Sequence, residues 1–125
     1  MNPGDMQADT RSLPGAPLPG LRTDTFDGLA DLMDDGDAAL IIGQTHVAIT
    51  CAYYAANTAL ITLGYIHPVT QAIRDYETAL RDHANARIVR ADGTRAGQSN
   101  DTVADLRAAY LTVRAEIVTA RAEIV

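Results

Sequence analysis

The histidines and the single cysteine are the side chains best suited to catalysis or metal binding. His46, His67 and His83 lie outside any HExxH motif, and none forms the ExxH pair of a di-metal helical bundle. Cys51 is surrounded in sequence by Ala, Thr and Tyr, with no nearby arginine that could stabilise a thiolate. A lone cysteine also excludes an internal disulfide and a zinc site made from several cysteines. We therefore interpret His46 as a core or interface residue and Cys51 as a small buried one.

The acidic run Asp34–Asp37 is the next candidate for metal chemistry. If Gly36 is placed at the glycine of an EF-hand loop, the positions of two calcium ligands fall on Met33 and Ile42, which cannot bind the ion. The loop Gly93–Gly97 follows no predicted strand, and the chain has no nucleophile-elbow or phosphate-loop motif. We expect no catalytic, cofactor-binding or metal site, and we interpret the acidic run as helix-capping residues that interrupt the chain.

The composition favours closely packed helices. The chain has 125 residues, of which 47% are hydrophobic and only 5% aromatic, enough for one modest core. The pattern predicts an all-α fold, a small bundle of about four helices at 24–33, 38–63, 68–89 and 101–125. These helices form a single helical domain over residues 23–125.

Residues 1–22 are predicted to form an extended arm, because this segment holds four of the five prolines and three glycines. Leu13, Leu18 and Leu21 are its regularly recurring apolar residues. One interpretation is a flexible terminus without a partner. The other is an arm that places these three leucines on a neighbouring subunit, which makes them interface candidates.

The longest predicted helix, 38–63, has no charged face. Asp37 is a suitable N-cap for it and Gly64 a suitable residue just past its end. Such a helix is either buried or spans a membrane. Polar residues such as Gln44 and Asn57 lower its hydropathy, and its nearest flanking charge on the N-terminal side is acidic, which disfavours a membrane span.

Burying this helix on all sides takes more cover than the rest of a short chain provides. We expect other copies of the chain to supply that cover, which predicts a homo-oligomer. Ala52 and Ala55 lie on the small face of the helix, where backbones can approach closely, and they are interface candidates.

The last predicted helix carries an uninterrupted apolar stripe with alternating spacings of three and four residues. Val113, Ile117 and Ile124 belong to it and are further interface candidates. Helix 68–89 has an inner stripe of Val69, Ile73, Tyr76, Leu80 and Ile88. Because only Tyr65-Ile66-His67 follow the Gly64 cap before this helix begins, we expect these two helices to form an antiparallel hairpin.

The net charge of −6 is concentrated near the N-terminus. Eight aspartates and two arginines up to Asp37 give −6, Ala38–Ile73 is uncharged, and the eight arginines and eight acids from Arg74 onward cancel. All ten basic residues are arginine. No basic patch with interleaved aromatic residues occurs, so we expect no direct nucleic-acid recognition.

The segment Leu29-Ala30-Asp31-Leu32, the following Asp37-Ala38-Ala39-Leu40 and then Ala52-Tyr53-Tyr54-Ala55-Ala56 carry a resemblance to a known family. Over residues 24–90 the chain resembles the head–tail connector (adaptor) proteins of tailed bacteriophages, which are small all-helical ring subunits. The resemblance implies a homo-oligomeric ring in the virion, without catalysis or cofactors, that docks to portal and tail or stopper proteins.

Three other interpretations stay open. The first is a small soluble, cytoplasmic helical module that binds or regulates proteins and dimerises through 101–125. The second is a membrane-associated protein that spans at 40–62. The third is an enzyme with an unrecognised site.

Overall fold

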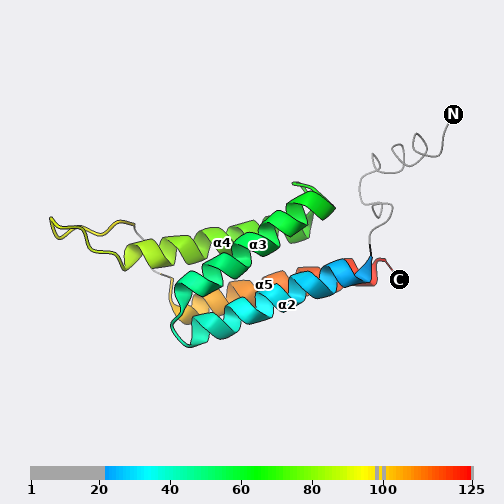
Figure 1. Ribbon diagram of the computed structural model, residues 1–125, viewed down its shortest axis with the longest axis horizontal. Coiled ribbons are helices and arrows are strands. Elements are labelled where there is room, and N and C mark those ends of the chain that lie inside the picture. Colours follow the sequence, from blue (N-terminus) through cyan, green and yellow to red (C-terminus); the bar gives the residue numbers. More distant parts are fainter. Residues whose placement is uncertain (1–21, 98, 100, 125) are drawn as a thin grey trace.

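The computed structural model describes residues 22–97, 99 and 101–124, which contain four helices. They are α2 (Thr23–Ile41), α3 (Thr45–Leu63), α4 (Pro68–Ala86) and α5 (Val103–Ala122). Figure 1 shows α2 beside α5 and α3 beside α4, with the chain direction alternating from one helix to the next. Each of α2 and α4 packs against both α3 and α5, so the four helices enclose one core. The predicted all-α bundle is confirmed, and the predicted arm lies outside the described residues apart from Arg22.

The first helix is longer than the sequence predicted. A break was expected at Asp34–Asp37, but α2 continues through these residues to Ile41. The Asp34 carboxylate accepts a hydrogen bond from the Tyr110 hydroxyl at 2.6 Å and lies 2.9 Å from the Arg114 Nε. The Tyr110 and Arg114 side chains of α5 thus pair with the Asp34 carboxylate. A carboxylate that is paired in this way does not compete for the backbone N–H groups of α2, so Asp34 does not interrupt the helix.

The chain instead breaks at Gly43, inside the predicted helix 38–63, and α3 begins only at Thr45. Gly43 has a φ of 85°, its N–H donates to the Leu40 carbonyl at 3.1 Å, and the Gln44 N–H donates to the Ala39 carbonyl at 2.9 Å. This pair of bonds is a Schellman motif, which needs a residue with positive φ after the helix. The end of α3 lies where the sequence predicted it, with Gly64 directly after Leu63.

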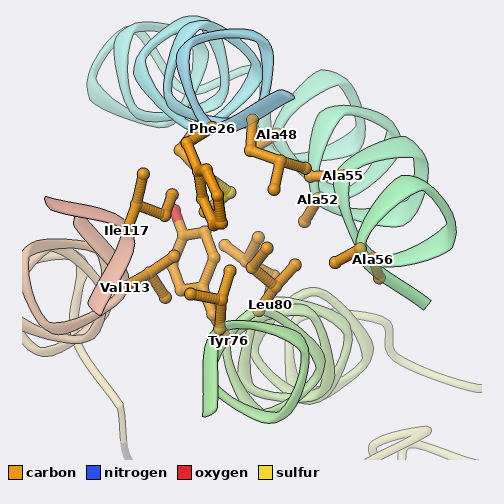
Figure 2. Packing of buried hydrophobic residues seen from close by; sticks show 14 of the residues in the cluster. Phe26, Ala48, Ala52, Ala55, Ala56, Tyr76, Leu80, Val113 and Ile117 are labelled. Carbon is orange, nitrogen blue, oxygen red and sulfur yellow. The ribbon is translucent and has the colours of Figure 1, made fainter. Parts of the chain in front are cut away.

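The core is lined by the inner stripes of all four helices (Figure 2). The predicted stripe of α4 is confirmed at Val69, Ile73, Tyr76 and Leu80, while Ile88 lies beyond the end of the helix and is exposed. The predicted α5 stripe is buried at its centre, and Thr102 and Asp105 form a capping box at the start of that helix. The α5 residues in the core are Leu106, Val113, Ile117 and Ala120.

Small residues let α2 and α3 approach closely. A Cβ placed on Gly36 would lie 3.2 Å from the Cys51 Cβ and 3.6 Å from the Ala48 carbonyl oxygen. The alanines of α3 at positions 48, 52, 55 and 59 are all buried on this side. The small face that was expected to allow close approach is therefore used within the chain.

Candidate protein interface

Helix α3 has one buried face and one exposed face, and the exposed face carries large apolar residues together with the polar Asn57 and Thr58. Tyr53, Tyr54 and Leu60 are exposed there, and Ile61 has 83% of its surface accessible. The rings of Tyr53 and Tyr54 lie 5.7 Å apart between centroids. Transfer of a large aliphatic side chain out of water is favourable, so the exposure of Ile61 destabilises the isolated chain relative to a complex that buries it.

The turn after α3 extends this surface. Tyr65 is exposed, and Ile66 is 83% accessible. The Arg74 guanidinium of α4 lies 4.7 Å from the centre of the Tyr65 ring, a cation–π contact at the edge of the patch. We name the residues Tyr53, Tyr54, Leu60, Ile61, Tyr65 and Ile66 the α3 face.

The α3 face carries no charge of its own, because no Asp, Glu, Lys or Arg occurs between Ala38 and Ile73. Exposed apolar surfaces of this kind mark protein interaction sites more often than single exposed residues do. The α3 face is therefore the candidate interface, and the sequence signal for it was the uncharged stretch itself.

The predicted interface residues lie elsewhere. Ala52, Ala55, Val113 and Ile117 are buried in the chain's own core and point toward its centre (Figure 2). Ile124 is partly buried against the same core. The other helices of the same chain already cover these five residues, so a second copy is not needed to bury them. The three predicted arm residues, Leu13, Leu18 and Leu21, lie outside the described residues.

A second exposed apolar stripe runs along α5, on the side away from the core. Leu111 and Val118 are the large residues of this stripe and are 62% and 60% accessible. Exposed alanines continue the stripe with alternating spacings of four and three residues, at Ala104, Ala108, Ala115 and Ala122. This spacing is that of a coiled-coil seam.

His67 and His83 make hydrogen bonds within the fold, whereas His46 is exposed in the chain and Cys51 is partly buried. Burial raises the pKa of the Cys51 thiol, and the nearby Asp35 carboxylate raises it further, which opposes a reactive thiolate. His67 caps α4, because its Nδ1 accepts a hydrogen bond from the Val69 N–H at 3.1 Å. The His83 Nδ1 lies 2.9 Å from the Asp101 carbonyl oxygen and ties α4 to the segment before α5. Within the described residues, no group of three or more His, Cys, Asp or Glu side chains could hold a metal ion.

Comparisons of the chain with family models, curated proteins and solved structures found no match. Among the helices that the structure describes, none combines the length and the hydropathy needed to cross a membrane.

Proposed function

We propose that this chain is a structural subunit of a homo-oligomeric assembly, held together by contacts between α3 faces. The observation that carries the proposal is the exposure of Tyr54, Ile61 and Ile66 in a stretch of the chain that contains no Asp, Glu, Lys or Arg. Burial of these side chains against a partner would stabilise a complex, since full burial of one large apolar side chain contributes roughly 1.5–3 kcal/mol of favourable free energy.

Charge favours a second copy as the occupant of this face. The net charge of −6 lies in the residues up to Asp37, so two copies repel each other where these acidic segments meet. Contact through the α3 face brings no charged residue of α3 against another, and the Arg74 guanidinium at the edge of the face lies over the Tyr65 ring. The face that exposes the large apolar residues of α3 to water is thus also the face at which electrostatic repulsion between identical chains is weakest.

The specific assembly that we propose is the head–tail connector ring of a tailed bacteriophage, located in the virion between the portal and the tail. Its support is the resemblance carried by Leu29–Leu32, Asp37–Leu40 and Ala52–Ala56. Two residues of the last segment, Tyr53 and Tyr54, belong to the α3 face. Contact between two α3 faces joins subunits in pairs, so a ring would need a second, head-to-tail contact, and portal and tail or stopper proteins would dock to other surfaces.

A second candidate function is a helical module that dimerises through α5. The observation that favours it is the exposed stripe with Leu111 and Val118, whose spacing suits helix-to-helix packing. Its large residues are fewer than those of the α3 face, and the core stripe of α5 with Val113 and Ile117 is already used inside the chain. We therefore place the α3 face first.

One arginine substitution on each surface distinguishes the two candidate interfaces. We expect Ile61→Arg to reduce the native mass measured by sedimentation velocity, because the new charge would be buried in the contact. Thr78→Arg is the matched control, since Thr78 is exposed on α4 and the change in net charge is the same. Circular dichroism should show unchanged helix content for both variants.

Leu111→Arg tests the second candidate in the same assay. If this variant alone loses mass while Ile61→Arg keeps it, the α5 stripe is the interface and the proposal for the α3 face is wrong. If all three variants keep the wild-type assembly, neither surface holds the copies together.

A further inference from the structure

The segment between α4 and α5 contains an ordered basic loop, residues 87–97. An antiparallel bridge joins Val89 to Arg95, and the Arg90 N–H donates to the Thr94 carbonyl at 2.7 Å. The Asp92 carboxylate accepts hydrogen bonds from the N–H and the hydroxyl of Thr94 at 2.9 and 2.7 Å. Figure 1 shows this loop extending past the end of the helical bundle. A loop fixed by its own hydrogen bonds loses little conformational freedom when it binds a partner.

The base of the loop is held against α4. A Cβ on Gly97 would lie 2.8 Å from the Asn85 Cβ, so the returning chain passes directly over the end of that helix. The Ala96 N–H donates to the Ile88 carbonyl at 2.9 Å and closes the base. The loop is therefore presented in a fixed position relative to the bundle.

The loop holds the arginines that the rest of the chain leaves without a partner. Five arginines are in ion pairs, at positions 22, 81, 107, 114 and 121, and Arg74 lies over Tyr65. Arg11 lies outside the described residues. The remaining three, Arg87, Arg90 and Arg95, are exposed and have no carboxylate partner within the described part of the chain. Exposed Ile88 and Val89 lie beside them, so the loop offers both charge and apolar surface.

Helix α2 presents an acidic surface of the complementary kind. Asp31 and Asp35 are one turn apart on α2, both are exposed, and neither is in an ion pair among the described residues. Like charges four residues apart destabilise a helix, so a cation placed between them relieves the repulsion. Two neighbouring acids of α2 are neutralised in this way within the chain, since Asp27 and Asp34 are each paired with an arginine of α5.

We infer that the loop 87–97 of one copy docks on the Asp31–Asp35 surface of α2 in a second copy. Charge complementarity selects this occupant: the loop has three arginines and one aspartate, a net charge of +2, which leaves −8 on the rest of the chain. The contact joins two different surfaces, so it is head-to-tail and generates a closed ring or an open filament. The inference rests on the proposed homo-oligomer and adds a second contact, distinct from the α3 face.

Two charge-reversed variants of the full chain test this contact by sedimentation velocity. The loop variant is Arg90→Glu with Arg95→Glu, and the helix variant is Asp31→Arg with Asp35→Arg. Each variant alone opposes like charges at the contact, so we expect each to sediment as a smaller species than the wild type. An equimolar mixture pairs opposite charges in both directions, so we expect it to recover the wild-type mass. The control is Asp75→Arg with Asp82→Arg, which alters two exposed acids of α4 and should leave the mass unchanged.

Salt gives a second readout, since screening weakens exposed charge pairs. We expect 0.5 M NaCl to lower the wild-type mass. The inference is overturned if the loop and helix variants assemble like the wild type, or if each dissociates and their mixture does not recover. The proposed function stands in both cases, provided that the wild type assembles and Ile61→Arg does not. A wild type that stays monomeric at every concentration overturns the proposed function itself.

Discussion

Arg107 and Asp37 are 70 residues apart in sequence and are joined by two hydrogen bonds. The Arg107 Nε donates to one oxygen of the Asp37 carboxylate at 3.0 Å, and the Nη2 donates to the other at 3.2 Å. This bidentate geometry is the strong form of the arginine–carboxylate pair. Asp37 is buried, so its charge depends on Arg107 for compensation.

Two further pairs repeat this relationship along the same helices. Arg114 lies 2.9 Å from Asp34, and Arg121 lies 2.7 Å from Asp27. Three of the six aspartates of α2 thus meet three arginines of α5 in antiparallel order. The order of the pairs matches the antiparallel register of the two helices.

Asp37→Asn should lower the free energy of unfolding by about 1–3 kcal/mol, because it removes one partner of a buried charged hydrogen bond. Urea denaturation followed by circular dichroism measures the change. Asp75→Asn is the control, and we expect a change within about 0.5 kcal/mol, since Asp75 is exposed on α4 and is in no ion pair among the described residues. Equal effects of the two substitutions would show that the Asp37 pair contributes nothing to stability.

The two glycines inside α2 should respond differently to alanine. No heavy atom lies within 4 Å of a Cβ placed on Gly28, so we expect Gly28→Ala to raise the free energy of unfolding by about 0.5–1 kcal/mol. At Gly36 the added Cβ would lie 3.2 Å from the Cys51 Cβ, and crowding offsets this gain. Gly36→Val should lower the free energy of unfolding by about 1–3 kcal/mol. A similar gain for Gly28→Ala and Gly36→Ala in urea denaturation would contradict the close approach of α2 and α3.

Tyr76 is buried, and its hydroxyl has no hydrogen-bond partner within the described chain. Burial, followed by the charge of Asp37, raises its pKa to about 12 from the ordinary 10.0. Between these two values the unfolded chain releases a proton that the folded chain keeps, so stability falls as the pH rises through this window.

Tyr76→Phe removes the unpartnered hydroxyl and keeps the ring. We expect the free energy of unfolding at pH 7 to rise by up to about 1 kcal/mol. The variant should also lose the alkaline destabilisation that the wild type shows between pH 10 and 12. Melting temperatures of both proteins from pH 8 to 12 check this expectation, and parallel curves would rule out a buried Tyr76 hydroxyl.

His67 gives the fold an acid-sensitive cap. Burial lowers its pKa below the ordinary 6.5, while Glu123 and Glu116 act in the opposite direction. Below pH 6.5 the unfolded chain therefore binds a proton before the folded chain does. The contribution of His67 to stability is fully present above that pH and is lost as the pH falls through the lowered value. Protonation also removes the lone pair that accepts the Val69 N–H.

His67→Asn keeps a helix-capping side chain that does not titrate in this range. We expect the free energy of unfolding to fall more steeply for the wild type than for this variant as the pH drops from 7 to 5. His67→Ala should cost about 1 kcal/mol at pH 7. If the wild type and His67→Asn lose stability in parallel, the His67 cap is not pH-sensitive.

Local sequence patterns predicted the helices that end at local signals. Pro68 at the start of α4 and Gly64 after α3 are such signals, and both ends lie as expected. The failure at Asp34–Asp37 has a non-local cause, since the arginines and the tyrosine that hold these acids lie on α5. Gly43 was a usable local signal, but the absence of charged residues around it favoured a single long helix.

The candidate interface was harder to predict from sequence than the fold. Lack of charge predicted that α3 is covered, but it did not predict which face the chain's own helices cover. The small residues Ala52 and Ala55 pack against neighbouring helices of the same chain, and the larger Tyr54 and Ile61 are left outside. Side-chain volume decides this, because α2 and α3 approach closely only across small residues such as Gly36.

The native mass of the wild-type chain tests the central claim most directly. Sedimentation equilibrium of the full chain over a wide range of concentrations measures it without any substitution. We expect a mass that is a multiple of the 13.3 kDa chain mass and that persists on dilution into the low micromolar range. A mass of 13.3 kDa at every concentration would show that the α3 face does not join copies of this chain.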